Sequence, residues 1–224
     1  MMRFLSTAVL AMSSLAFAQV PSSVSWVRVV HAASDAPAVD VLANGNVVFQ
    51  GLTFRTYTDY TPVPPGAYTF TVNLTGTATT VISTGSVMLQ GGSAYTFYAM
   101  GTVAKSNLIL IGTGDVVNAP APGSSLIRVI HAASSAPTVD VYATAPYAPL
   151  GAALLTGVPF TAASPQVIVP AGNYQARVTP MGSKTVAIDS GRLAITGGTV
   201  RTVVALDPAT PGGPFQLMVL NDVN

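Results

Sequence analysis

The sequence predicts an all-β protein made of two tandem immunoglobulin-like antiparallel β-sandwich domains. The first observation is a duplication: VRVVHAASDAPAVDV at residues 27–41 returns as IRVIHAASSAPTVDV at residues 127–141, an offset of 100 (127 − 27). A repeat of this length suits a whole domain rather than a solenoid unit. The second observation is the composition, which has no Glu, few Lys and many Val and Thr. Such a composition favours strands over helices.

Short runs of apolar or alternating residues predict about seven or eight strands in each repeat. The clearest runs lie at residues 27–32, 39–42, 68–72, 95–99, 108–111 and 217–220. Asn44-Gly45 separates two apolar runs and predicts a tight hairpin, because both residues tolerate positive φ. Gly91-Gly92 and Gly197-Gly198 are typical of turns at matching places in the two repeats. No segment keeps a helical period, so a sandwich is the predicted architecture.

The chain is expected to divide into a leader, two domains and a linker. Residues 1–18 have an early cation, an apolar run and a small-x-small site at 16–18, which together predict a secretory signal peptide. The two sandwich repeats are expected at residues 19–115 and 125–224. The Pro- and Gly-rich stretch 116–124 is predicted to be a short linker. Domains tethered so closely should pack together or move only modestly.

The second repeat differs from the first in one longer loop. Between Ala143 and Gly157, the tight Asn44-Gly45 hairpin gives way to a loop that contains TAPYAP at 144–149. Proline disfavours a regular strand ladder there, and Tyr147 is expected to be exposed. We predict that this loop is a contact surface for a partner.

The charge balance excludes several classes of partner. The chain has 9 Lys and Arg against 8 acidic residues, all Asp, and removing the signal peptide with its Arg makes the two signs equal. Because the cations are scattered, neither nucleic acid nor an anionic lipid surface is an expected partner.

The chain has no Cys, which excludes disulfides and a lipobox anchor, and no apolar run of the mature chain is long enough to span a membrane. We expect an extracytoplasmic protein, periplasmic, at the envelope surface or secreted, whose partners are envelope or surface proteins or further copies of itself.

The motif RVVHAASDAPAVDV, followed by the hairpin and by VPPGAYTFTV, resembles the family called domain of unknown function (DUF) 4397. The family pattern is RVxHASPDAPxVDV, and its members are secreted or surface β-sandwich modules, often in tandem, without an established shared activity. The resemblance covers nearly all of the mature chain and implies such a module. Ala33-Ser34 and Ala133-Ser134 stand where the family has Ser-Pro, and Ser135 stands where it has Asp. Any role of that Asp is therefore expected to be lost in the second repeat.

The repeated motif is expected to be mainly structural. If the strands that flank the motif loop pair antiparallel, Arg28 lies opposite Asp40, and the same register predicts an ion pair between Arg128 and Asp140. His31 ends the first strand, where its ring can pack inward and bond the loop backbone. Proline then fixes the return of the chain, and a Tyr two residues after Gly is typical of a tyrosine corner, whose hydroxyl bonds the backbone upstream. The residues assigned to this structural motif are Arg28, Pro37, Tyr68, Arg128, Pro137 and Tyr174.

A metal site is the alternative for the same motif. Imidazole and carboxylate ligands suit copper or zinc, and copper-zinc superoxide dismutases use an extracytoplasmic sandwich. The candidate ligands are His31, Asp35, Asp40, His131 and Asp140. Each repeat has one His, so a site would need both His to converge, or one His with carboxylate and backbone ligands. A hydrolase is disfavoured, because His31, Ser34 and Asp35 are crowded into five loop positions.

These observations predict a secreted cell-envelope structural or interaction module with no catalytic residue and no cofactor. The alternative is an extracytoplasmic, copper-binding, superoxide-dismutase-like oxidoreductase that uses the two His motifs.

Overall fold

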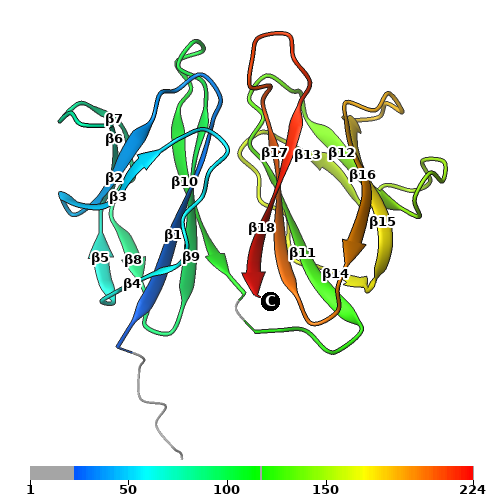
Figure 1. Cartoon of the computed structure of the whole chain (residues 1–224), viewed down its shortest axis with the longest axis horizontal. Helices are drawn as coiled ribbons and strands as arrows, with labels where there is room; N and C mark the ends of the chain where they lie inside the picture. The colour runs from blue at the N-terminus through cyan, green and yellow to red at the C-terminus, as the bar shows by residue number, and fades with distance from the viewer. Residues whose placement is uncertain (1–22, 117, 224) are drawn as a thin grey trace, which may run out of the picture.

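The chain folds into two β-sandwiches that stand side by side in a computed structural model, which describes residues 23–116 and 118–223 (Figure 1). The strands of the first sandwich are β1 (Ser25–Ala33), β2 (Val39–Ala43), β3 (Asn46–Leu52), β4 (Thr61–Val63), β5 (Gly66–Tyr68), β6 (Phe70–Leu74), β7 (Thr80–Ser83), β8 (Val87–Leu89), β9 (Ala94–Gly101) and β10 (Ile109–Asp115). The strands of the second are β11 (Ser124–His131), β12 (Val139–Thr144), β13 (Leu155–Val158), β14 (Val167–Pro170), β15 (Gly172–Pro180), β16 (Ile188–Ile195), β17 (Val200–Leu206) and β18 (Gln216–Val223). The all-β prediction is confirmed.

Each sandwich has an inner and an outer sheet. In the first, the order β10-β9-β1-β4 forms the inner sheet and β3-β2-β6-β7 the outer one, with β5-β8 as a small separate ladder. In the second, the corresponding sheets are β14-β11-β17-β18 and β13-β12-β15-β16. Most neighbouring strands are antiparallel, as predicted, but β1 pairs parallel with β9 and β11 pairs parallel with β17. A parallel pair needs a long connection, and here that connection runs through the outer sheet.

Side chains of β1 alternate between the core of the first sandwich and the interface with the second sandwich. Val27 and Val29 point into the core between the two sheets of the first sandwich. Val30 and Ala32 point the other way, because successive side chains of a strand lie on opposite faces. They belong to a second apolar cluster that draws on both repeats: Val30, Ala32, Tyr98, Met100, Ile130, Ala132, Val204, Leu206, Met218 and Leu220. The two inner sheets therefore pack against each other through a buried apolar interface, as the short linker predicts.

The predicted hairpin turn is present, and residues 116–123 separate the strands of the two sandwiches. Asn44 and Gly45 have φ of 49° and 80°, as the predicted hairpin requires. The last strand of the first repeat ends at Asp115, and the first strand of the second begins at Ser124. The predicted signal peptide, residues 1–18, lies outside the described residues. Within residues 23–116 and 118–223, no helix has the length and apolar character needed to cross a membrane.

Candidate functional site between the two repeats

The motif arginine of the first repeat reaches into the second repeat. Arg28 points from β1 toward the interface and is 1% exposed. Its Nη2 pairs with the carboxylate of Asp222, near the end of β18. Its Nη1 donates to the carbonyl of Asn221 at 3.1 Å, and its Nε donates to Oγ1 of Thr96 at 2.8 Å. One guanidinium thus joins its own sheet to the last strand of the other repeat.

The second repeat returns the same contacts. Arg128 pairs with the carboxylate of Asp115, near the end of β10, and its Nη1 donates to the carbonyl of Gly114 at 2.9 Å. Its Nε donates to Oγ1 of Thr202 at 3.3 Å. Each motif arginine therefore binds the last strand of the other domain, so the two domains are locked reciprocally around a pseudo-twofold axis.

The two ion pairs belong to one buried polar cluster, which Tyr60 and Thr202 complete. The Cζ atom of Arg28 lies 4.5 Å from the ring centroid of Tyr60, and the Tyr60 hydroxyl donates to Oδ2 of Asp115 at 2.8 Å. Burial raises the pKa of Tyr60, so this hydroxyl stays protonated and able to donate. Burial also raises the pKa of Asp222, but Arg28 and Thr202 stabilise its charged form. The cluster thus links both ion pairs within one desolvated interface.

The predicted pairs Arg28–Asp40 and Arg128–Asp140 are wrong. β1 pairs with β4 and β9, whereas Asp40 lies on β2 in the outer sheet, so the assumed ladder does not form. Asp40 instead accepts bonds from the amides of Gly51 and Gly76, at 2.8 and 3.0 Å. These backbone donors lower its pKa. The carboxylate therefore fixes two turns of the outer sheet.

Asp140 does the same in the second repeat. It accepts bonds from the amides of Gly157 and Gly182, both at 2.9 Å, and these donors lower its pKa. Since the carboxylate oxygens bind backbone amides of their own repeat, the motif aspartate organises loops within a domain, and the motif arginine works between domains.

Each motif histidine braces its own loop. Nε2 of His31 lies 3.1 Å from the carbonyl of Pro37, and Nε2 of His131 lies 3.0 Å from the carbonyl of Pro137. A carbonyl can only accept, so the proton of the neutral imidazole sits on Nε2. Both rings are 1% exposed, and burial lowers the pKa of each. The prediction that the ring packs inward and bonds the loop backbone describes this geometry.

The proposed metal ligands lie in separate places. Asp35 accepts bonds from the amides of Val103 and Ala104, at 2.7 and 2.9 Å. Asp40 and Asp140 bind turns of the outer sheets, away from this loop. Among the residues that the structure describes, no group of three His, Cys, Asp or Glu side chains could hold a metal ion.

The aspartate missing from the second motif is replaced from another loop. Asp207 follows β17, is 2% exposed, and accepts bonds from the amides of Ser134 and Ser135, both at 2.8 Å. In the first repeat the carboxylate of Asp35 lies on the motif loop and binds the loop after β9. In the second repeat the carboxylate lies on the loop after β17 and binds the motif loop. The expectation that the role of this Asp is lost in the second repeat is therefore wrong, because Asp207 makes the same kind of clamp.

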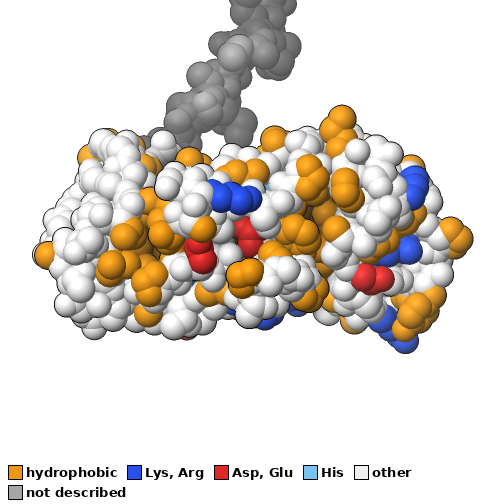
Figure 2. All heavy atoms as spheres, turned by 90° about the horizontal axis from the view of Figure 1, so that it is seen from above, with side chains coloured by type: hydrophobic (Ala, Val, Ile, Leu, Met, Phe, Trp, Pro, Cys, Tyr) orange, Lys and Arg blue, Asp and Glu red, His pale blue; other side chains and the backbone are white. Residues whose placement is uncertain are grey.

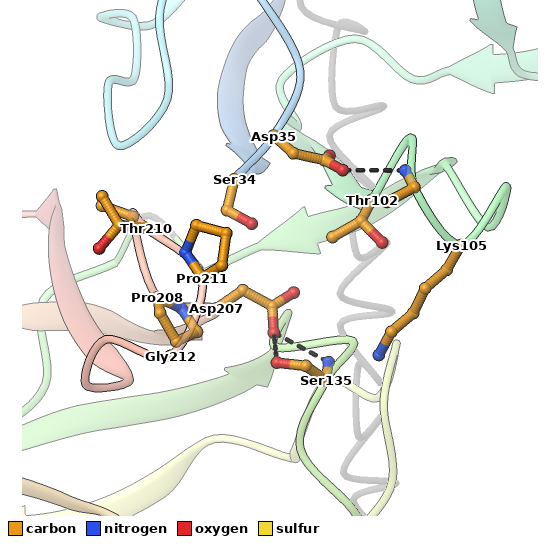
Figure 3. A pocket seen from close by; sticks show the side chains of 12 residues that line it. Ser34, Asp35, Thr102, Lys105, Ser135, Asp207, Pro208, Thr210, Pro211 and Gly212 are labelled. Atoms are coloured by element: carbon orange, nitrogen blue, oxygen red, sulfur yellow. Dashed lines mark hydrogen bonds between the residues drawn. The ribbon is translucent and has the colours of Figure 1, made fainter.

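The two motif loops meet at an interdomain groove of about 440 Å³. The groove is lined by Ser34, Asp35, Thr102, Ala104, Lys105, Ser135, Asp207, Pro208, Ala209, Thr210, Pro211 and Gly212 (Figure 3). Lys105 crosses it, since its Nζ donates to the carbonyl of Ser134 at 3.0 Å. The face seen in Figure 2 carries only a few charged side chains among many uncharged ones. Because both groove carboxylates already bind backbone amides, the groove offers a ligand mainly the apolar surface of its alanine and proline side chains, with a few hydroxyls beside it.

The longer loop of the second repeat is held on the outer sheet. The amide of Tyr147 donates to Oε1 of Gln175 at 2.7 Å, and Nη2 of Arg177 donates to the carbonyl of Ala148 at 2.6 Å. Gln175 and Arg177 lie on β15 and are buried under this loop. Tyr147 itself is 83% exposed and has a φ of 63°. Its exposure agrees with the prediction, but nothing in the sequence pattern singled out Gln175 or Arg177 as the supports.

The predicted tyrosine corners have the expected bond. The hydroxyl of Tyr68 donates to the carbonyl of Pro64 at 2.9 Å, and that of Tyr174 donates to the carbonyl of Pro170 at 3.0 Å. Each bond fixes the turn that leads into the strand.

Comparison with known proteins identifies the family. No curated protein matches the chain. A solved structure described as "Alpha-glucan binding by a streptococcal virulence factor" is 10% identical, with 83% of this chain and 94% of that chain covered and a TM-score of 0.27. A likeness this weak transfers nothing about ligands. The family model described as "Domain of unknown function (DUF4397)" matches residues 25–142, which cover the first sandwich and run into the second, and residues 125–224, which cover the second sandwich. These matches cover most of the chain, so the protein belongs to the DUF4397 family, with two tandem copies of the domain.

Proposed function

We propose that the protein is an extracytoplasmic structural or interaction module of the cell envelope, which uses the interdomain groove to bind an envelope or surface protein. The observation that carries the proposal is the reciprocal locking of the repeats by Arg28 with Asp222 and by Arg128 with Asp115. A fixed interface holds the two motif loops at one groove, and a preorganised surface loses less entropy when it binds.

The chemistry of the groove supports binding rather than catalysis. Its carboxylates and its one lysine are already hydrogen-bonded to backbone groups, and both buried imidazoles brace loops. A general base or nucleophile needs a free functional group within reach of a substrate. The groups of the groove are arranged instead to hold its walls in place.

The proposal is tested by filling the groove with a bulky, charged side chain. Ala209 is an exposed groove residue, so Ala209→Arg should fill the groove without disturbing a core. Ala78→Arg, in the exposed turn between β6 and β7, is the matched control. We expect the mature protein in the extracytoplasmic fraction, with its N-terminus at Gln19. It should bind isolated envelopes of the source cells saturably, and Ala209→Arg should weaken this at least tenfold while Ala78→Arg leaves it unchanged. Equal binding by the two variants, or a cytoplasmic protein, would refute the proposal.

A further inference from the structure

The first sandwich fills one end of its core with two aromatic rings. Phe70 and Phe97 are 0% and 1% exposed, and their ring centroids lie 4.2 Å apart. Gly112 opposite Phe97 makes room for the ring, since a Cβ atom at this glycine would lie 2.8 Å from Cε1 of Phe97. Phe70 pairs with Ala43 across the outer sheet, and Ala43 is buried too. This end of the first core is therefore closed.

The same positions of the second sandwich hold small side chains. The strand register identifies them: Ala176 pairs with Ala143 as Phe70 pairs with Ala43, and Val203 pairs with Val219 as Phe97 pairs with Gly112. The two rings are thus replaced by a methyl and an isopropyl group. The sheets keep the same strand order in both repeats, so the second sandwich has the same frame around two much smaller side chains.

A cavity of about 50 Å³ lies at this place in the second sandwich. It is lined by Val129, His131, Val139, Val141, Tyr142, Ala143, Leu154, Ala176, Val178, Val203, Ala205 and Leu217. Ala143 and Ala176 are only partly buried and Leu154 is exposed, whereas Ala43 and Phe70, which correspond to Ala143 and Ala176, are buried. The cavity therefore reaches the surface beside these three residues, of which Leu154 lies in the longer loop.

The lining offers a water too few hydrogen-bond partners. His131 is one of its two polar side chains, and both ring nitrogens are engaged: Nε2 with the carbonyl of Pro137 and Nδ1 with the amide of Ala133, at 3.3 Å. Tyr142 is the other; its hydroxyl accepts a bond from Nζ of Lys184 at 3.2 Å and keeps its own proton as a donor, so at most one side chain of the lining has a polar group left for a water. A buried water needs about two to four polar partners, so this cavity favours an apolar occupant.

The size of the cavity selects the shape of that occupant. A cavity of about 150 Å³ holds benzene, and the cavity of about 50 Å³ is a third of that. A ring does not fit, but the last few carbons of a straight alkyl chain do. We propose that the second sandwich is a binding site for the end of an alkyl chain, which enters beside Leu154. The site lies inside one domain and away from the interdomain groove, so its test is independent of the proposed function.

Hexanoate and xenon are suitable probes for the mature protein. Hexanoate carries a soluble head on a short alkyl chain, and xenon reports any accessible apolar cavity. Methyl resonances of Val141, Val178 and Leu154 should shift saturably with either probe, and the methyl groups of the first core should not. Binding of xenon without hexanoate would show a simple packing defect and would overturn the proposal, as would the absence of saturable shifts with both probes.

Two variants make the assignment specific. Ala176→Val adds two methyl groups at the cavity wall and should reduce hexanoate binding at least tenfold; unchanged binding would place the ligand elsewhere and overturn the proposal. Phe70→Ala introduces into the first repeat one of the two replacements found in the second and should add a second hexanoate site with shifts near Val72. A folded Phe70→Ala protein that still binds one hexanoate would contradict the argument from strand register. If Phe70→Ala does not fold, Phe97→Val opens the equivalent space from the inner sheet with a smaller loss of volume and should give the same second site.

Discussion

Removal of Asp222 should destabilise the whole protein, because it leaves a buried arginine unpaired. The side chains of Arg28 and Asp222 are both 1% exposed, so solvent screens their interaction little. Arginine stays charged in proteins and cannot relieve its burial by losing a proton. Breaking such a pair by deleting one partner costs about 3–5 kcal/mol, against about 0–1 kcal/mol for a surface pair. We expect Asp222→Ala to lower the free energy of unfolding by about 3–5 kcal/mol, the range for a broken buried pair.

A double-mutant cycle isolates the interaction free energy between Arg28 and Asp222. Arg28→Met with Asp222→Ala should recover much of the loss, because no unpaired charge is then buried. Urea unfolding of the mature protein, followed by circular dichroism, gives the four free energies. Arg192→Met is the control, since Arg192 is exposed on β16 and its loss should cost less than about 0.5 kcal/mol. A cost of under about 1 kcal/mol for Asp222→Ala, or strong dependence on salt, would mean that the interface is open to water and the reasoning is wrong.

The remaining predictions concern packing, pH and metal. Gly112→Ala should cost about 1–3 kcal/mol in urea unfolding, because its Cβ would meet Phe97, whereas Gly114→Ala, with open space around it, should cost much less; equal costs would refute the packing argument. Since burial lowers the pKa of His31 and His131, the unfolded chain binds more protons below about pH 6.5, so the midpoint of thermal unfolding should fall from pH 7 to 5. Replacing both by Gln should flatten this slope, and an unchanged slope would assign it to other groups. Protein purified without a histidine tag should contain far less than one copper per chain by elemental analysis, and stoichiometric copper retained through dialysis and lost on replacing the two His would favour the metalloprotein instead.

The local features of the fold could be predicted because they depend on neighbouring residues. Asn44-Gly45 predicted a hairpin from the backbone freedom of two residues, and Tyr68 predicted a bond to a carbonyl only four positions upstream. The role of His31 followed in the same way, since its partner Pro37 lies within the motif. Each of these interactions is set by sequence separations that the turn geometry itself restricts.

The site between the repeats depended on contacts that no local pattern contains. Arg28 and Asp222 are separated by 194 positions, whereas the predicted pairing with Asp40 required consecutive strands to share a sheet. No sequence pattern indicates Asp207, because the duplication aligns it with a glycine, Gly101, and not with the Asp35 whose role it takes.

The sequence by itself determined the duplication, the strand content, the turns and the family. These follow from side-chain periodicity and backbone preference, which act over a few residues. Only the tertiary structure decided which face of each inner sheet meets the other repeat, which carboxylate pairs with each arginine, and that the second core keeps a cavity where the first packs Phe70 against Phe97. The physical reason is that ion pairing and packing depend on distances in space. Strand pairing within the sheets and packing between them bring together residues that are far apart in the chain.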